Sequence, residues 1–272
     1  MRRPPYLPFL NGPLSLAPGL KPIPPETWLV PDTEAHVLDE KRALMRTKRD
    51  RVHVEREGSS RAAQALAAAV HDVAGPAAGD WPTALEAAAS TVSDDFCILI
   101  KDEAGQWRLQ AANVCAPTFW RLSETIGQPL GGLHSPVPGA NPGLVGRIHR
   151  MFDGIQPGTV LERFNWNVQP GPDRFTPNQA EFKAKADTMP VEGALDALWL
   201  RVERQTITKL PETGAMVFTI RVAIDPMRAV LADAAHRAAF SAAWEAIDPV
   251  LAEYKGWPHY DRLVRAALQQ AR

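Results

Sequence analysis

The sequence predicts an α+β fold in which an antiparallel sheet is flanked by helices at both ends of the chain. Helical patterns fill residues 33–89, strand patterns gather between residues 96 and 222, and helical patterns return at residues 225–271. A run of strands set between runs of helices is typical of α+β proteins. The chain has 272 residues, of which 45% are hydrophobic, and shows no repeat or linker, so we expect a single domain over residues 1–272.

The N-terminal region is expected to be an extended arm followed by helices. Residues 1–31 hold many of the 25 prolines, which disfavour a helix, while Trp28 and Leu29 offer apolar anchors. The helix that begins at Thr33 is expected to run on towards Glu57, and the next begins at a serine whose hydroxyl suits an N-cap. Helices are thus predicted over residues 33–51, 59–73 and 83–89.

The first predicted strand pair joins residues 96–100 to residues 107–111 through a turn rich in acidic and small residues. Counting back from this turn puts Cys97 opposite Gln110. Cys115 then lies some residues beyond that point and out of disulfide reach. Both thiols are therefore expected to be buried and free.

The clearest hairpin joins residues 198–210 to residues 215–222. If its turn has four residues, the last residue of one strand faces the first residue of the next, and Arg204 lies opposite Arg221. Like charges across a ladder cost stability unless an anion relieves them. The pair therefore predicts a carboxylate partner, such as a haem propionate, for which the guanidinium fork is suited. The alternative is that the two side chains splay into solvent, or that the register is shifted by one.

Glu203 lies on a polar face of the first strand of this hairpin, together with Trp199, Arg201 and Gln205. Such a face is either exposed to solvent or forms the wall of a pocket. Runs of charge usually lie in water, which favours the solvent face.

The remaining elements follow from glycine and proline. Asp225 and Pro226 form an N-cap and first-turn pair that starts the helical C-terminal region at residues 225–271, which Pro249 and residues 256–258 interrupt. A helix over residues 117–126, a helix over residues 142–152 and a strand over residues 160–168 complete the prediction.

Composition excludes several classes of function. The formal net charge of -1 offers no basic face for duplex binding, so no nucleic-acid partner is expected. No apolar run reaches the roughly 18 residues of a membrane span, and the proline-rich start is unlike a signal peptide, so a cytoplasmic location without membrane is expected. The two cysteines have no CxxC spacing, which excludes thiolate zinc and iron–sulfur sites within the chain.

His134 differs from the other histidines of the chain. It lies in a loop punctuated by glycine and proline at residues 130–139, where backbone can be held rigidly close to a ligand. This setting favours a metal-binding or catalytic role, although a lone histidine is more often structural. The other six lie in charged or helical contexts that indicate the surface: His36, His53, His71, His149, His236 and His259.

Several short motifs occur in order along nearly the whole chain. They include Lys41-Arg42-Ala43-Leu44, Cys115-Ala116-Pro117, His134-Ser135-Pro136-Val137-Pro138, Arg163-Phe164-Asn165-Trp166, Arg201-Val202-Glu203-Arg204-Gln205-Thr206, Phe218-Thr219-Ile220-Arg221 and Tyr254-Lys255-Gly256. In this ordered set the chain resembles the haem-dependent oxidative N-demethylase family, the α subunit of dimethylamine-monooxygenase-type systems.

The resemblance implies a PAS-like antiparallel sheet that holds haem b and uses O2 to demethylate a small secondary alkylamine, with release of formaldehyde. It also implies that electrons come from NADPH through a separate reductase subunit that carries flavin and a 2Fe-2S cluster. The absence of cysteine clusters and nucleotide motifs agrees with this division of labour.

The resemblance further implies roles for single residues. By position, His134 is expected to be the axial ligand of the haem iron. Glu203 is expected to contact the protonated amine, since a carboxylate in a pocket attracts a cation. The other cofactor-binding candidates are Arg163, Asn165, Trp166, Arg204 and Arg221.

Two other interpretations stay open at this point. A PAS-like haem or small-molecule sensor would bind without turnover, and the lack of a fused output domain favours the enzyme over it. A family member that keeps the fold and has lost the cofactor is the third possibility.

Overall fold

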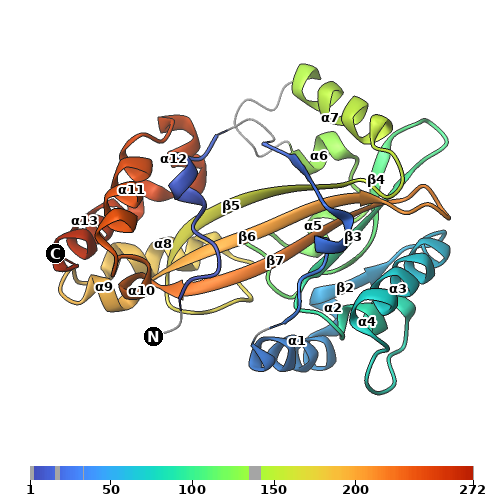
Figure 1. Cartoon of the computed structure of the whole chain (residues 1–272), viewed down its shortest axis with the longest axis horizontal. Helices are drawn as coiled ribbons and strands as arrows, with labels where there is room; N and C mark the ends of the chain where they lie inside the picture. The colour runs from blue at the N-terminus through green and yellow to red at the C-terminus, as the bar shows by residue number, and fades with distance from the viewer. Residues whose placement is uncertain (1–2, 16–18, 33, 135–141, 272) are drawn as a thin grey trace. The chain divides into compact units, whose positions relative to one another are not determined.

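The computed structural model describes residues 3–15, 19–32, 34–134 and 142–271, without the side chains of residues 134 and 142–145. Its strands are β1 (Lys21–Ile23), β2 (His53–Glu55), β3 (Asp95–Lys101), β4 (Trp107–Asn113), β5 (Val160–Pro170), β6 (Leu198–Lys209) and β7 (Met216–Pro226). They form one sheet in the order β1-β5-β6-β7-β3-β4-β2 (Figure 1). β1 pairs antiparallel with β5, β2 with β4, and β3 with both β4 and β7. The predicted α+β class is confirmed.

Helices precede, interrupt and follow the strands. None of those in the described part of the chain has the length and apolar character that crossing a bilayer requires. The α-helices are α1 (Ala35–Thr47), α2 (Arg49–Val52), α3 (Ser60–Ala74), α4 (Ala84–Ala89), α5 (Leu122–Thr125), α6 (Leu130–His134), α7 (Pro142–Gly154), α8 (Gln179–Thr188), α9 (Ala194–Ala197), α10 (Met227–Val230), α11 (Ala234–Glu245), α12 (Pro249–Lys255) and α13 (Asp261–Gln270). The described residues also include the 3-10 turns η1 (Pro8–Asn11), η2 (Pro25–Thr27) and η3 (Trp257–His259).

The chain divides into two compact units, and each is described by itself. The first unit comprises Met1–Gly19, Phe164–Arg204 and Val222–Arg272, and the second comprises Leu20–Arg163 and Gln205–Arg221. Three strands, β5, β6 and β7, contribute residues to both units.

The first unit has an aromatic core. Trp244 and Trp257 stack at 4.0 Å between ring centroids, and Trp166 lies 4.8 Å from Trp257. Phe9, on η1, meets the edge of Phe240 on α11 at 5.3 Å. Aromatic rings bury large areas and pack best when offset or edge to face, so this cluster fixes α11 and η1 to β5.

One apolar core of the second unit lies on one face of its strands. Cys97 and Leu99 of β3, Met216 of β7 and Ile207 of β6 are buried there with Ile148 of α7. Among the described residues, eight apolar side chains pack against this cluster while only partly buried: Leu20, Val54, Trp120, Ile126, Leu133, Met151, Leu161 and Phe218. We call them the apolar rim.

The register of the first hairpin differs from the predicted one. Residues 102–106 form the loop, and its first carboxylate accepts a hydrogen bond at 2.8 Å from its last backbone N–H. A bulge in β4 at Gln110, opposite Ile98 and Leu99 of β3, shifts the ladder by one further residue. Cys97 therefore lies opposite Ala112, and its predicted position opposite Gln110 is wrong. Both cysteines are nevertheless buried and free, as predicted.

The second hairpin has the predicted register. The Leu210 N–H donates to the Ala215 carbonyl at 2.9 Å, which closes the four-residue turn. The hydroxyls of Thr206 and Thr219 meet across the strands at 2.5 Å, which continues the same count. Turn length fixed the pairing here because the ladder has no bulge between these two pairs.

Three predicted helix positions are wrong. The helix expected over residues 117–126 is reduced to α5, because Phe119 has a φ of 64°, in the left-handed region, which a helix cannot include. The run expected towards Glu57 gives way to β2 after Val52. Asp225 is not an N-cap, since β7 continues to Pro226 and α10 begins after it.

Candidate functional site

Arg221 is ion-paired inside the second unit. Its Nε and Nη2 donate to Asp94 Oδ2 at 2.9 and 2.5 Å, and its Nη1 lies 3.1 Å from Asp32 Oδ1. Side chains alternate along β7, so Arg221 points away from the face that carries Met216 and Phe218. The anionic partners of Arg221 are therefore carboxylates of the protein, and the cofactor proposal below does not include this arginine.

A second buried charge pair follows the first in sequence. Lys41 Nζ donates to the Val92 carbonyl at 3.2 Å and lies 3.7 Å from Asp95 Oδ1. Asp95 Oδ2 accepts a hydrogen bond at 2.7 Å from the Ala116 backbone N–H. Burial raises the pKa of Asp95, against the opposing effects of Lys41 and of the backbone donors. These contacts fix α1 to β3.

A histidine that the sequence placed on the surface is buried. His53 is 5% exposed, and its Nε2 lies 3.3 Å from Glu55 Oε1 and 3.8 Å from Glu86 Oε2. Arg49 holds Glu86 through two hydrogen bonds of 2.7 and 3.0 Å. The hydrogen bond from His53 is the largest cause that lowers the pKa of Glu55. Among the residues that the structure describes, no three His, Cys, Asp or Glu side chains are arranged to hold a metal ion.

Glu203 is buried, and the predicted solvent face is therefore wrong. It lies in the first unit with 5% exposure, and its Oε2 accepts a hydrogen bond from Asn165 Nδ2 at 3.0 Å. Asn165 Oδ1 in turn accepts from Lys255 Nζ at 2.7 Å. We call these three residues the Lys-Asn-Glu relay. It joins the C-terminal end of α12 to two neighbouring strands.

The end of α12 is bound to β5 at successive residues. Lys255 Nζ also donates to the Trp166 carbonyl at 3.1 Å, and the Lys255 carbonyl accepts from Asn167 Nδ2 at 3.4 Å. Trp257 Nε1 donates to Asn167 Oδ1 at 2.7 Å. Beside the relay, burial and the negative charge of Glu203 raise the pKa of Tyr254, so its hydroxyl stays protonated at neutral pH.

Arg201, on the same side of β6 as Glu203, is hydrogen-bonded to the backbone of the loop at residues 171–176. Its guanidinium is 1% exposed and donates to the carbonyl of Asp173 at 3.3 Å and to that of Arg174 at 3.1 Å. These bonds assign Arg201 to the structure of residues 171–176. Arg204, a cofactor candidate, is 4% exposed on the opposite side of the strand.

Trp166 belongs to the aromatic core of the first unit. Its side chain is 1% exposed, and its ring meets Phe9, Phe240, Trp244 and Trp257. The indole therefore serves packing, and we leave it out of the cofactor proposal.

His134 is the last residue of α6, in the second unit. Its side chain and residues 135–141 lie outside the described part of the structure. The preceding Leu133 belongs to the apolar rim, which places the end of α6 beside the core of this unit.

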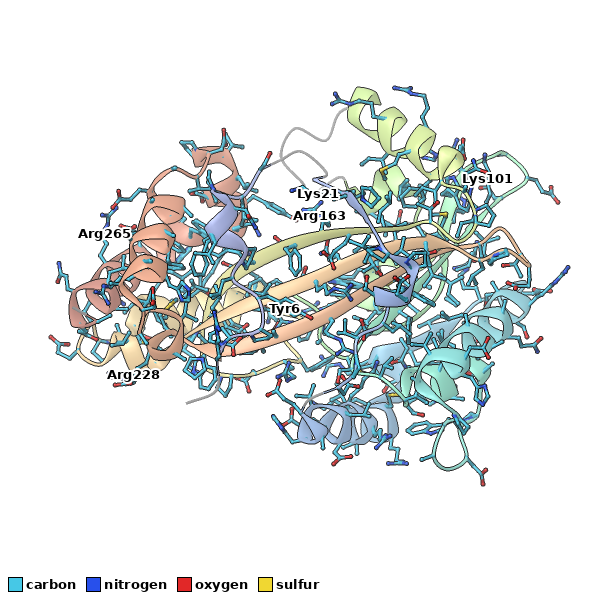
Figure 2. All side chains as sticks on the ribbon, viewed as in Figure 1. Tyr6, Lys21, Lys101, Arg163, Arg228 and Arg265 are labelled. Carbon is cyan, nitrogen blue, oxygen red and sulfur yellow. The ribbon has the colours of Figure 1, made fainter. Side chains whose placement is uncertain are left out.

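Arg163 extends from β5 in the second unit (Figure 2). It is half-buried and follows Leu161 by two residues, so both side chains lie on the same face of the strand. Leu161 belongs to the apolar rim. Arg163 therefore places a guanidinium next to partly exposed apolar side chains, an arrangement that suits a ligand with an apolar body and an anionic edge.

The candidate site residues that the sequence predicted thus fall into two groups, one in each unit. His134 and Arg163 lie with the apolar rim in the second unit, and Asn165 and Glu203 form a relay in the first. The sequence missed Lys255 as a member of this relay, although a lysine before a glycine at a helix end signals a cation held by its neighbours.

A protein-family model described as haem-dependent oxidative N-demethylase, alpha subunit-like, matches residues 71–265.

Proposed function

The chain belongs to the haem-dependent oxidative N-demethylase, alpha subunit-like family, and from this premise we propose that it oxidatively demethylates a small secondary alkylamine. The family match is the observation that carries the proposal. Removal of one methyl group as formaldehyde takes one oxygen atom of O2. The other atom leaves as water with two protons and two electrons, which a reductant must supply.

The residues of the second unit fit a haem b. A porphyrin needs apolar contacts for its faces and cations for its propionates. The apolar rim offers the apolar contacts, and Arg163 beside it offers a cation. His134, at the end of α6, is the residue that would ligate the haem iron. Arg204 lies opposite Arg221 in the hairpin, on the face that points away from the apolar rim, and we leave it out as well. When bound, the haem iron supplies the oxygen activation that attack on an N-methyl group requires.

Glu203 is the proposed contact for the substrate. A secondary alkylamine is protonated at neutral pH, and a carboxylate that accepts hydrogen bonds in a buried setting is a suitable partner for its N–H groups. The carboxylate would hold and orient the cation through its oxygen atoms. Asn165, which donates to this carboxylate, belongs to the same site.

The electrons are proposed to come from NADPH through a separate reductase subunit that carries flavin and a 2Fe-2S cluster. The family description as alpha subunit-like supports a partner subunit. No step of the proposal requires this chain to bind a nucleotide.

The test is the visible spectrum of the protein purified with adequate haem supply. We expect a Soret band that His134→Ala abolishes or shifts and that His71→Ala, at an exposed histidine of α3, leaves unchanged. A wild-type protein without the band would sink the haem proposal. A band that His134→Ala leaves unchanged would sink the ligand assignment alone. Haem without amine-dependent formaldehyde release in the presence of reductant would favour the sensor.

The substrate contact has a separate test. Calorimetric titration with dimethylammonium chloride is expected to show about tenfold or greater loss of affinity in Glu203→Gln, because one charge-assisted hydrogen bond contributes about 1.5–3 kcal/mol. Unchanged affinity would remove Glu203 from the proposal.

A further inference from the structure

Trp244 and Trp257 of the first unit are stacked more closely than aromatic pairs in proteins usually are. Their ring centroids lie 4.0 Å apart and their planes are 4° from parallel. Aromatic pairs typically have centroids about 4.5–7 Å apart. Phe9 and Trp166 of the same core follow that rule, since they meet edge to face at 6.3 Å. The π faces of Trp244 and Trp257 are therefore in direct contact, and a positive charge on one ring would be attracted by the other.

Each indole of this pair donates its N–H to an oxygen atom that favours a positive ring. Trp244 Nε1 donates to Asp261 Oδ1 at 3.0 Å, and Trp257 Nε1 donates to the amide oxygen of Asn167 at 2.7 Å. The two tryptophans are 5% and 2% exposed, so little water surrounds the rings. Electrostatic interactions are stronger there than in water. The carboxylate of Asp261 therefore stabilises a positive charge on the stacked rings.

Asp261 is held in its ionised form. Burial raises its pKa, but the hydrogen bonds from Arg265 and Trp244 outweigh this effect, and the pKa is lowered overall. Arg265 Nε donates to the second carboxylate oxygen at 2.8 Å and offsets part of the negative charge. A carboxylate with a lowered pKa is a poor acceptor for the indole proton. The positive charge of an oxidised Trp244 therefore stays on the rings.

Another tryptophan with a carboxylate partner shows what is particular to this pair. In the second unit, Trp107 Nε1 donates to Asp153 Oδ1 at 2.9 Å. Its ring meets Phe152 at an angle of 69°, and Lys101 Nζ lies 5.7 Å from its centroid. A cation over the face of a ring makes removal of an electron from that ring more costly. Both sites have the carboxylate, and the stacked second indole distinguishes the site of Trp244.

We propose that Trp244 and Trp257 form a one-electron redox site, which is oxidised in preference to the other tryptophans of the chain. The pair loses one electron to an oxidant, and the oxidant is reduced by that electron. No bond breaks, and the Nε1 protons stay in place. The two indoles share the resulting positive charge beside Asp261, and one electron from a reductant restores them.

The use of this site in the protein rests on the proposed function. Haem that activates O2 is an oxidant, and without an amine its oxidising equivalents must leave by another route. The pair supplies an electron to such an oxidant and so spares other side chains. The reductase of the proposed function would then return the electron to the pair.

The first test does not depend on haem. The full-length protein, purified without added haem, is exposed to azide radicals, a small one-electron oxidant, generated by pulse radiolysis. We expect the absorption of a tryptophan radical cation with a further band in the near infrared, which arises when two stacked rings share one charge. A neutral tryptophan radical, or a radical cation without the near-infrared band, overturns the proposal.

Three variants make this test specific. Asp261→Asn keeps an oxygen acceptor for the Trp244 N–H and removes the charge, so the yield of the radical cation should fall about tenfold. Trp257→Phe should abolish the near-infrared band. Asp153→Asn is the matched control, because it removes the same charge beside Trp107, and the yield should equal that of the wild type. If Trp257→Phe does not fold, Asp261→Asn decides: an unchanged yield in it, or an equal fall in Asp153→Asn, overturns the proposal.

The second test connects the redox site to the proposed function. The haem-loaded protein is mixed with hydrogen peroxide in the absence of amine, frozen, and measured by electron paramagnetic resonance. We expect a tryptophan radical that is about tenfold weaker in Asp261→Asn. A protein with a Soret band but without this radical overturns the use of the pair in the protein. A protein without a Soret band fails the proposed function, and the azide-radical test then decides on the redox site by itself.

Discussion

Replacement of Arg221 by methionine is expected to unfold the protein at much lower urea concentration, because it leaves a buried carboxylate without its cation. Asp94 has no exposed surface, and Arg221 reaches it with two hydrogen bonds and reaches Asp32 with a third contact. Two unit charges about 3 Å apart attract by about 5 kcal/mol at an effective dielectric constant of about 20. Removal of one partner of a buried pair typically costs about 3–5 kcal/mol.

That loss is a large share of a typical stability of about 5–15 kcal/mol, so it is measurable by urea unfolding followed by tryptophan fluorescence. The double variant Arg221→Met with Asp94→Asn should recover part of the loss, since it removes the stranded charge. Arg228→Met is the matched control, because Arg228 makes the same kind of pair with Asp196 in an exposed position. Its unfolding midpoint should stay close to that of the wild type.

The same variant decides between two roles for Arg221. A structural ion pair predicts lost stability with unchanged haem content in the molecules that remain folded. A propionate ligand predicts the reverse, with a weakened Soret band at unchanged stability. The reverse result would refute our structural assignment of this arginine.

Three further variants or conditions are informative. Burial raises the pKa of the Cys97 and Cys115 thiols, so neither should react with a thiol reagent at pH about 8 until urea is added. Gly256→Ala should lower the free energy of unfolding by roughly 1–2 kcal/mol and with it the urea midpoint, because a side chain at its φ of 72° is strained. The pKa of Glu55 is lowered in the folded state, so its stabilising effect is present above the unfolded pKa and lost as the pH falls through the folded one. His53→Gln should therefore reduce stability at neutral pH and approach the wild type in acid, as measured by urea unfolding across pH.

The two hairpins show what a sequence can specify about register. The turn after Leu210 is set by four consecutive residues, so counting from it gave the correct pairs as far as Thr206 and Thr219. The turn after β3 is longer than expected, and the bulge at Gln110 of β4 has no signal in the sequence. An insertion of one residue on one strand shifts every later pair, and the error therefore reached Cys97.

Burial of charge was harder to predict than the strands themselves. Glu203 and His53 were placed at or near solvent by their local sequence, and Arg221 was expected either to meet a carboxylate or to reach solvent; all three are buried. Their partners are distant in the chain: Asn165 is 38 residues from Glu203, and Asp94 is 127 residues from Arg221. A charge is buried when such partners satisfy it, and only the folded chain brings them together.

The sequence predicted which types of side chain the candidate site contains, but it did not predict all of the residues that form it. Asn165 and Glu203 came from the resemblance as a cofactor and a substrate residue, and the structure joins them in one hydrogen-bonded relay. Lys255 completes the relay from α12. The position of this lysine before a glycine indicated a cation held by its neighbours, but which neighbours hold it depends on how that helix ends against β5.

Alternation along the strands explains how three consecutive residues in one motif take different roles. Phe164 packs against the aromatic core near Tyr6, and Trp166 lies inside that core, while Asn165 between them faces the opposite side. On β6 the same period places Val202 in the core and Glu203 on the side of Asn165.

The apolar and polar members of these motifs are therefore coupled. A slip of one residue in β5 would move Asn165 into the core and Trp166 out of it, at the cost of a large buried area and an unsatisfied amide. The aromatic core thus fixes the register that the relay needs, since the energy that holds Trp166 in place also holds Asn165 between Lys255 and Glu203.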